Sequence, residues 1–484
     1  MNIFIGALIL SIWHSILFWD KEIGLSALLF AIPLIYVTIK ILEGKTENKK
    51  ALLLSIPIIL LSSTYFIFNN ELFNALNIVI IPLLYIIMMM LATTKELKIK
   101  SIIFKILAVI IEPFNYFGEV IVELKNKILP AKEEKKEKRE KKNIIKATIL
   151  TGLIVIIVLI LLGTADSEFA SLFLDILDAI INLSLPSLVI RIGVIIILFF
   201  YISSFFINIL SKGNGLNEIN NEEENSKKEN LTINMILTTL NVIYLIFCVT
   251  QTKQLLNIEN VIYSEFARKG FFQLMVVTLI NLLVILKATS KDLKETEKQA
   301  KYKKTMCIVM IIFTFILIIL SFTKMNLYIE QYGDTRLRLL VKFTLLTETI
   351  LLIPTSMYIM SSKVNLVKTY LIIITTMYCI INFANIDNLI AKRNVQRFEE
   401  TGKIDIWYLT GELDKATVLE QVYKLKSIKP EAEIQNEYIK YNLDTYINKF
   451  VENTKSELPE KTNIQEFNLI KWKAKKFINE EVRY

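Results

Sequence analysis

The sequence predicts an all-α protein, a polytopic transmembrane helical bundle of about 11 spans with a small C-terminal helical domain outside the membrane. Three observations predict this class. The 484-residue chain is 53% hydrophobic, with a mean hydropathy of +0.47. Apolar runs of roughly 18–22 residues recur along it, long enough to cross a hydrocarbon core about 30 Å thick. After residue 385 the chain turns polar, with acidic and basic residues nearly balanced.

The predicted spans follow the apolar runs in chain order. They are 3–19, 25–42, 51–68, 74–92, 147–163, 187–210, 231–250, 270–287, 305–323, 337–360 and 369–385. The first run lacks a basic start and a small-residue cleavage site, so we expect an uncleaved span rather than a removed signal peptide. The stretch 101–128 is interrupted by Lys105, Glu112 and Pro113. It predicts an amphipathic element on the membrane surface, with a twelfth span as the alternative.

Lysines in the short loops indicate the orientation. The segments 43–50, 132–142, 288–304 and 361–368 carry these lysines and fall on one side of the predicted spans. The acidic loop 164–186 falls on the other side. Because cytoplasmic loops of membrane proteins are rich in Lys and Arg, we predict a multi-pass cell-membrane protein with a cytoplasmic N-terminus and an extracytoplasmic C-terminus.

Composition divides the chain into four segments. Residues 1–128 contain N-terminal membrane helices and the interfacial stretch, 129–146 a basic cytoplasmic linker, 147–385 the core membrane helices, and 386–484 an extracytoplasmic helical domain. In the last segment "KATVLEQVYKLKS" and "FNLIKWKAKKFINEEV" have helical spacing of apolar residues. Pro430 and Pro459 separate these helices.

Several classes of chemistry are excluded. The only histidine, His14, lies in the first apolar run, which rules out a histidine triad or a multi-histidine metal site. The three cysteines, Cys248, Cys307 and Cys379, lie far apart in apolar runs and form no CxxC motif. The chain has no phosphate-binding loop, dinucleotide fingerprint, HExxH or GxSxG. We therefore expect no catalytic residue, metal or cofactor, and the net charge of +9 serves membrane orientation rather than nucleic-acid binding.

Four charged stretches occur where predicted spans begin or end. They are "GTADSEF" (163–169), "YSEFARKGFFQL" (263–274), "LYIEQYGDTRLRL" (327–339) and "NIDNLIAKRNVQRFEETGKIDIWYL" (385–409). Together they resemble an uncharacterised bacterial family, the domain of unknown function 4173, related to 4153. The resemblance covers most of the chain from about residue 72 onward. It departs at Asp334, where the family usually has Leu, at Phe266 in place of a second Tyr, and at Lys324 in place of Arg. The resemblance implies membrane localisation and no particular chemistry.

The same four stretches predict a polar site at the outer membrane face. The side chains that we expect to converge there are Asp166, Glu265, Arg268, Arg336, Arg338 and Asp387. Neighbouring helices lower the local dielectric constant at such a position, so charge pairing gains strength there. The alternative is that Arg336 and Arg338 only mark a helix end at the lipid headgroups.

Three charges lie inside predicted spans: Glu348, Arg191 and Lys342. A charge in the bilayer centre costs at least about 2.5–3.5 kcal/mol unless it is paired or hydrated. As a functional group, Glu348 relays protons or binds a cation. As a structural group, it pairs with Arg191 or Lys342, or is protonated and hydrogen bonded to Thr347 and Thr349. Arg191 and Lys342 lie near span ends and can extend towards the surface. The asparagines Asn234, Asn241, Asn281 and Asn382 predict hydrogen bonds between helices.

Three functions fit these features. The first is a non-enzymatic sensor, scaffold or accessory protein of the cell envelope, with membrane lipids and an envelope protein at the C-terminal domain as partners. The second is a transporter of a small solute or lipid, which Glu348 and the in-span asparagines favour. The third is a membrane-embedded transferase acting on lipid-linked substrate, by analogy of architecture alone.

Overall fold

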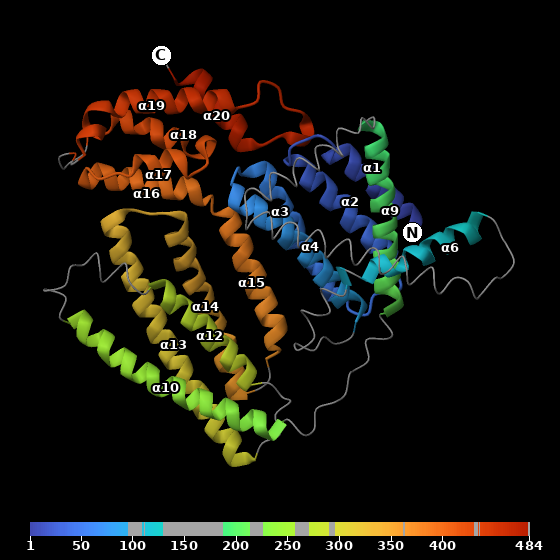
Figure 1. Cartoon of the computed structure of the whole chain (residues 1–484), viewed down its shortest axis with the longest axis horizontal. Helices are drawn as coiled ribbons and strands as arrows, with labels where there is room; N and C mark the ends of the chain where they lie inside the picture. Colours follow the sequence, from blue (N-terminus) through green and yellow to red (C-terminus); the bar gives the residue numbers. More distant parts are fainter. Residues whose placement is uncertain are drawn as a thin grey trace, which may run out of the picture. The chain divides into compact units, whose positions relative to one another are not determined.

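The computed structural model describes residues 1–94, 109–110, 112–128, 187–212, 226–256, 271–289, 296–361, 364–429, 434 and 436–482. Regular secondary structure in these residues is helical throughout (Figure 1). Packing divides the chain into two compact units. The first comprises Met1–Phe66, Asn74–Asn217 and Lys461–Asn468, and the second Ile67–Phe73, Glu218–Glu460 and Leu469–Tyr484. The four segments drawn from composition, with boundaries at 128, 146 and 385, stay a prediction.

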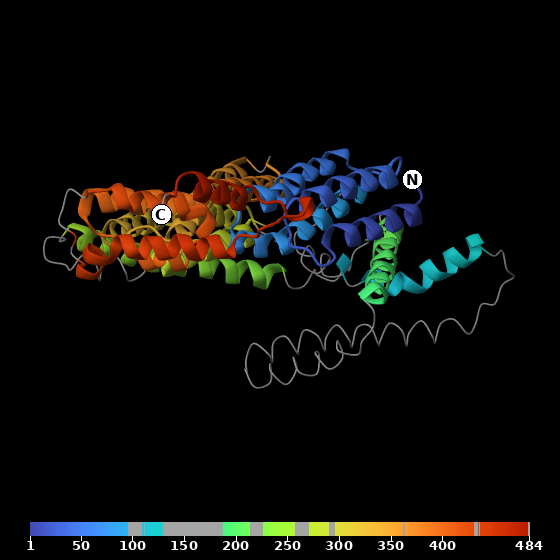
Figure 2. The same cartoon turned by 90° about the horizontal axis from the view of Figure 1, so that it is seen from above.

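The first unit is built on a hairpin of two apolar helices, α1 and α2. Its helices are α1 (Ile3–Phe18), α2 (Leu25–Leu42), η1 (Lys49–Leu54), α3 (Ser55–Ile67), α4 (Glu71–Thr93), η3 (Glu112–Tyr116), α6 (Phe117–Ile128) and α9 (Ser187–Lys212). Helix α1 packs along both α2 and α9, and α6 packs on α9 (Figure 2). With 12 residues, α6 is about 18 Å long and too short to cross a bilayer by itself.

Helices α10 (Ser226–Leu256), α12 (Phe271–Ala288), α13 (Glu297–Tyr332), α14 (Arg336–Ser361) and α15 (Leu366–Phe383) form the membrane part of the second unit. Helix α13 begins at a capping box, in which Thr296 Oγ1 accepts a hydrogen bond from the Gln299 N–H. Its 36 residues extend about 54 Å, well beyond the predicted span 305–323. Leu317, Leu345 and Leu352 are among the apolar side chains that fill the space between these helices.

A layer of helices lies across one end of α13, α14 and α15 (Figure 1). This C-terminal layer consists of α16 (Ile386–Thr401), α17 (Ile406–Gly411), α18 (Lys415–Lys424), η5 (Leu425–Ser427), α19 (Glu437–Glu457) and α20 (Leu469–Glu480). Asp405, Asp414 and Asn436 cap the N-termini of α17, α18 and α19. The buried core of the layer is continuous with Leu339 of α14 and Ile381 of α15. The predicted helices are therefore present, but the layer packs in one unit with the membrane helices, and a separate domain is not confirmed.

Seven helices of the described residues are long and apolar enough to cross a membrane. They are Leu25–Leu42, Lys49–Ile67, Glu71–Thr93, Ser187–Ser211, Thr232–Thr250, Glu297–Tyr332 and Leu366–Phe383. Ile3–Phe18 and Gln273–Ala288 are shorter apolar helices. The predicted count of about 11 is not confirmed. The predicted span 147–163 lies outside the described residues, and α14 is helical over the predicted span 337–360 without being one of the seven.

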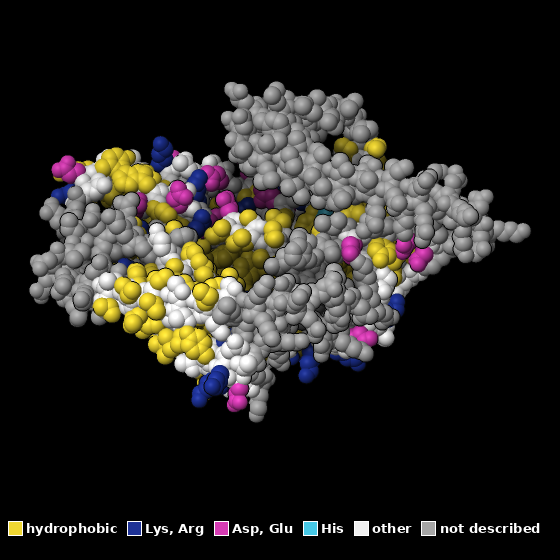
Figure 3. Space-filling model, turned by 60° about the horizontal axis from the view of Figure 1, so that its bottom comes forward, with side chains coloured by type: hydrophobic (Ala, Val, Ile, Leu, Met, Phe, Trp, Pro, Cys, Tyr) yellow, Lys and Arg dark blue, Asp and Glu magenta, His cyan; other side chains and the backbone are white. Residues whose placement is uncertain are grey.

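The second unit exposes large apolar side chains along its long helices. Ile246 of α10, Ile312 of α13, Ile353 of α14 and Ile372 of α15 are all more than half exposed. Figure 3 shows hydrophobic side chains gathered over its left-hand part, with charged side chains along the upper and lower edges. Large apolar side chains exposed along several long helices indicate contact with lipid rather than water.

Candidate functional site

The turn between α13 and α14 is held by the side chain of Asn394 on α16. Asn394 Oδ1 accepts the Asp334 N–H at 2.9 Å, and Asn394 Nδ2 donates to the Asp334 carbonyl at 2.9 Å. Gly333 precedes this pair with φ +79°. A Cβ at that position would collide with Asn394 Oδ1. Glycine is therefore required at 333 both by the backbone conformation and by the close approach of α16.

A buried ion pair joins the first residue of α14 to the first turn of α16. Arg336 Nε donates to Asp387 Oδ1 at 2.7 Å, and Arg336 Nη2 donates to Asp387 Oδ2 at 2.5 Å. The Asp387 side chain is 1% exposed and that of Arg336 is 22% exposed. Two parallel hydrogen bonds between guanidinium and carboxylate fix both distance and orientation. The pair therefore holds the start of α14 against α16.

Both members of the pair have further partners in the C-terminal layer. Asp387 Oδ2 also accepts the Asp414 N–H at 3.2 Å, and the Arg336 N–H donates to Tyr408 Oη at 2.7 Å. Asp414 caps α18 by accepting the Thr417 N–H and also accepts from Asn69 Nδ2. Burial raises the pKa of Asp414, and these hydrogen bonds oppose the rise. The pair is thus part of a network that reaches α17 and α18.

Two arginines satisfy the free carbonyl groups at the C-terminal end of α13. Arg397 of α16 donates to the carbonyls of Glu330 and Gln331, at 3.2 and 2.7 Å. Arg338 donates to the carbonyls of Tyr332 and Gly333. Cations are favoured at a helix C-terminus, where the last carbonyls lack partners and the dipole is negative. Burial, and after it the nearby charge of Arg338, lowers the pKa of Arg397.

The structure brings Arg336 and Asp387 of the predicted outer-face site into direct contact. Arg338 starts from the same turn but lies over the Tyr328 ring, 4.3 Å from its centroid, and bonds to its own turn. Asp166, Glu265 and Arg268 lie outside the described residues, so their convergence stays a prediction.

Sequence reasoning missed Asn394, Arg397, Tyr408 and Asp414. Asp387, Asn394 and Arg397 are spaced seven and three residues apart, which places them on one face of a helix. From that spacing within the stretch 385–409, Asn394 and Arg397 could have been predicted to lie beside Asp387. Tyr408 and Asp414 carried no such signal, because they reach the site through the folding of α17 and α18.

The three charges of the predicted spans have separate partners. Glu348 is buried and lies 2.5 Å from Thr278 Oγ1 of α12. Lys342 lies over the Phe322 ring, 5.0 Å from its centroid. In the first unit, Arg191 Nε donates to Ser15 Oγ at 2.7 Å. Thr347 and Thr349, the partners expected from the sequence, donate to carbonyls of their own helix, and the observed partner of Glu348 lies on another helix.

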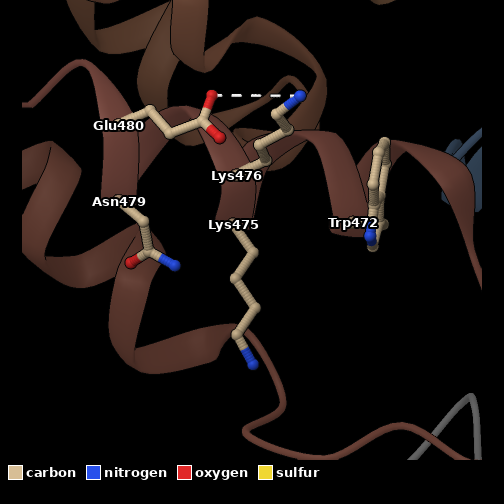
Figure 4. Close-up of a pocket in the computed structure, with 5 residues that line it drawn as sticks. All are labelled: Trp472, Lys475, Lys476, Asn479 and Glu480. Atoms are coloured by element: carbon tan, nitrogen blue, oxygen red, sulfur yellow. Dashed lines mark ion pairs between the residues drawn. The ribbon is translucent and has the colours of Figure 1, made fainter.

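The surface of α20 carries a shallow hollow of about 260 Å³, lined by Trp472, Lys475, Lys476, Asn479 and Glu480. Figure 4 shows all five side chains rising from this one helix. Lys476 Nζ lies 3.9 Å from Glu480 Oε2, and Lys475 donates to the carbonyls of Pro459 and Glu460. These solvated contacts stabilise the helix surface and provide no enclosed binding site.

Long apolar helices, lipid-facing side chains and a charged network at helix ends define a polytopic α-helical membrane protein. The chain belongs to the family described as Domain of unknown function (DUF4153), whose model matches residues 55–422. The match shows the family numbered 4153, which the sequence-based resemblance named as a relative; the family numbered 4173, which it named first, is not shown. The α13–α14 turn and all of α16 lie within the matched residues. Comparison with curated proteins finds no match, and comparison with solved structures finds none either.

Proposed function

We propose that this chain is a non-enzymatic sensor, scaffold or accessory protein of the cell envelope, in which the C-terminal layer transmits force or position to the membrane helices. The observation that carries this proposal is the Arg336–Asp387 ion pair together with the hydrogen bonds between Asn394 and the backbone of Asp334. These contacts make α16 and the α13–α14 turn one rigid element, so a load on the layer acts directly on two membrane helices. The partners that we propose are membrane lipids and an envelope protein at the C-terminal layer.

The second unit supports an extracytoplasmic position for this layer. Helix α13 starts beside Lys298, Lys301 and Lys304, and Lys304 Nζ donates to the Met360 carbonyl at the end of α14. The opposite end of α13 and α14 holds the turn that docks on α16. Lysine-rich ends of membrane helices generally face the cytoplasm, which supports an outer position for the layer. The number of spans that precede α10 does not change which end of α13 carries the lysines.

The first unit supports a cytoplasmic N-terminus. The Met1 amino group donates to the Lys40 carbonyl at 3.1 Å, which places the N-terminus beside the loop carrying Lys45 and Lys49. At the other end of α2, the Leu25 N–H donates to the Phe467 carbonyl of the segment Lys461–Asn468. The segment that connects α19 and α20 therefore lies at the end of α2 opposite the lysines, in agreement with an outer C-terminal layer.

A transporter of a small solute or lipid is the second candidate, favoured by the polar interior of the second unit. Tyr244 Oη donates to Asn281 Oδ1 at 2.5 Å, and Asn281 Nδ2 donates to Thr314 Oγ1 at 3.1 Å. These three residues lie on three different helices. Hydrogen bonds between helices explain them as well as a solute pathway does.

The test is complementation of a gene deletion, read out by envelope-stress reporters and lipid profiling. Asp387→Asn disrupts the pair, whereas Glu457→Gln removes an exposed pair with Lys415 on the same layer. We expect Asp387→Asn to fail in complementation and Glu457→Gln to succeed at equal membrane abundance. Full complementation by Asp387→Asn, with α16 shown to be undocked, contradicts the proposal.

Assays on the purified protein reconstituted in lipid vesicles distinguish the transporter and the transferase from the sensor, scaffold or accessory role. Saturable solute flux across vesicles containing the purified chain establishes the transporter, and turnover of a lipid-linked donor establishes the transferase. Loss of complementation in Asp387→Asn without flux or turnover supports the sensor, scaffold or accessory role.

A further inference from the structure

Glu348 is a deeply buried carboxyl group with one hydrogen-bond partner, Thr278, in the part of the chain that the structure describes. It lies near the middle of α14 and is 3% exposed. Its Oε2 is 2.5 Å from Thr278 Oγ1 of α12. Its Oε1 has no hydrogen-bond partner, and within the part of the chain that the structure describes no lysine or arginine forms an ion pair with it. An ionised carboxylate here would be a full charge facing one hydroxyl group.

The geometry of Thr278 indicates which group holds the hydrogen atom. Thr278 Oγ1 lies 2.7 Å from the Met275 carbonyl of its own helix and 2.5 Å from Glu348 Oε2. A hydroxyl group has one hydrogen and two lone pairs, so it donates to only one of these oxygens. The carbonyl cannot donate. When the hydroxyl hydrogen points to Met275, the contact with Glu348 is a hydrogen bond only if Glu348 carries the proton.

A neighbouring threonine shows the same arrangement with an unambiguous donor. Thr314 Oγ1 donates to the Met310 carbonyl at 2.7 Å and accepts from Asn281 Nδ2 at 3.1 Å. Asn281 lies one turn from Thr278 on α12. Thr355 likewise donates to the Leu351 carbonyl of its own helix. Buried threonines of this bundle thus direct their hydrogen to the helix backbone and accept from the neighbouring helix.

We propose that Glu348 and Thr278 form a proton-binding site inside the second unit, in which Glu348 is a neutral carboxylic acid donating to Thr278 Oγ1. The ligand is a proton, and Glu348 Oε1 is then an uncharged carbonyl oxygen, for which burial without a partner costs far less than for a carboxylate. The proposal is independent of the coupling through α16, since it rests on α12 and α14 alone.

A charge beside Glu348 would change its protonation, so the titratable groups on the helices packed against α14 bear on this site. Helices α12, α13, α15 and α16 pack against α14. Their titratable and charged groups in or near the apolar parts are Lys287 on α12, Cys307, Lys324 and Tyr328 on α13, Tyr370, Tyr378 and Cys379 on α15, and Asp387 on α16. Tyr370 shares a hydrogen bond with Thr355, and Asp387 pairs with Arg336. Protonation therefore makes the Glu348 carboxyl group neutral at this position.

Carbodiimide labelling of the full chain in membrane vesicles tests the proposal. A protonated carboxyl adds across one C=N bond of dicyclohexylcarbodiimide: its oxygen bonds to the central carbon, its proton moves to a nitrogen, and the adduct rearranges to a stable N-acylurea without a leaving group. Peptide mass spectrometry then locates the adduct. We expect modification at Glu348 at neutral pH, falling about tenfold per pH unit on the alkaline side of its titration. Asp387, buried but ion-paired, is the matched control and should stay unmodified.

Infrared spectroscopy tests whether Glu348 is protonated and hydrogen bonded to Thr278. We expect a neutral-carboxyl carbonyl band that is lost in Glu348→Gln, moves to higher frequency in Thr278→Val and keeps its position in Thr278→Ser. An unmodified Glu348 in folded wild-type protein, or a carboxyl band that Thr278→Val leaves unchanged, overturns the proposal. The labelling arm uses wild-type protein, so a variant that fails to fold does not remove the test.

Discussion

Replacing Asp387 by Asn should undock α16 from the α13–α14 turn. In the structure three N–H groups point at the Asp387 carboxylate: Arg336 Nε, Arg336 Nη2 and the Asp414 backbone N–H. An amide keeps one acceptor oxygen and puts two N–H donors in place of the other oxygen, so a donor faces a donor. The change also leaves the guanidinium of Arg336 without its counter-charge.

The magnitude follows from the exposure of the two partners. Breaking a buried ion pair by removing one partner typically costs about 3–5 kcal/mol. Arg336 remains 22% exposed, so water recovers part of that cost, and we expect about 2–4 kcal/mol. This corresponds to a roughly 30- to 1,000-fold larger population of the undocked state. The matched control Glu457→Gln removes a pair whose side chains are 34% and 56% exposed, and it should cost about 0–1 kcal/mol.

Hydrogen exchange of the full chain in detergent or nanodiscs measures this opening, because the backbone amides of α16 exchange when the layer separates from the turn. In Asp387→Asn, the protection factors of the α16 amides should fall roughly 30- to 1,000-fold, while the amides of α13 inside the membrane stay protected. The double variant Arg336→Gln with Asp387→Asn should lose less than the sum of the single variants, since neither charge is then left alone. Equal protection in Asp387→Asn and Glu457→Gln would falsify the claim that the pair holds the layer.

Three further predictions follow from the same geometry. Gly333→Ala should destabilise the turn by about 1–3 kcal/mol, because an alanine is strained at this φ and collides with Asn394. The control is Gly411→Ala, whose new Cβ meets open space. It should leave the hydrogen-exchange protection of α16 unchanged. Alkaline phosphatase fused after residue 482 should be active and a fusion at residue 46 inactive; the reverse pattern excludes the proposed orientation. The third prediction uses a variant that lacks Cys248, Cys307 and Cys379. If the outer-face stretches converge, cysteines introduced by Glu265→Cys and Arg338→Cys should form a crosslink. Folded protein without any crosslink between those stretches would show that Arg336 and Arg338 only mark a helix end.

Helix positions in the membrane part were readable from the sequence, because a chain in lipid must satisfy its backbone hydrogen bonds within each helix and therefore needs long apolar runs. The run 25–42 coincides with α2, and the run 187–210 with α9 to within two residues. The run 305–323 gave only the apolar middle of α13, because the polar turns at each end are extended by a capping box and by arginine contacts at the C-terminus. The side of the membrane on which the C-terminal layer lies stays a prediction from the lysine positions.

Pairing between side chains was decided only by the tertiary structure. Arg336 and Arg338 are two residues apart, so they leave α14 in different directions, and only Arg336 meets Asp387, 51 residues further along the chain. Glu348 is flanked by Thr347 and Thr349, yet its partner is Thr278, 70 residues away, because α12 packs against this face of α14. Composition and periodicity determine that a helix forms and that its charges need partners. The rotation and packing of neighbouring helices determine which partner each charge meets, and that information is spread over residues distant in the sequence.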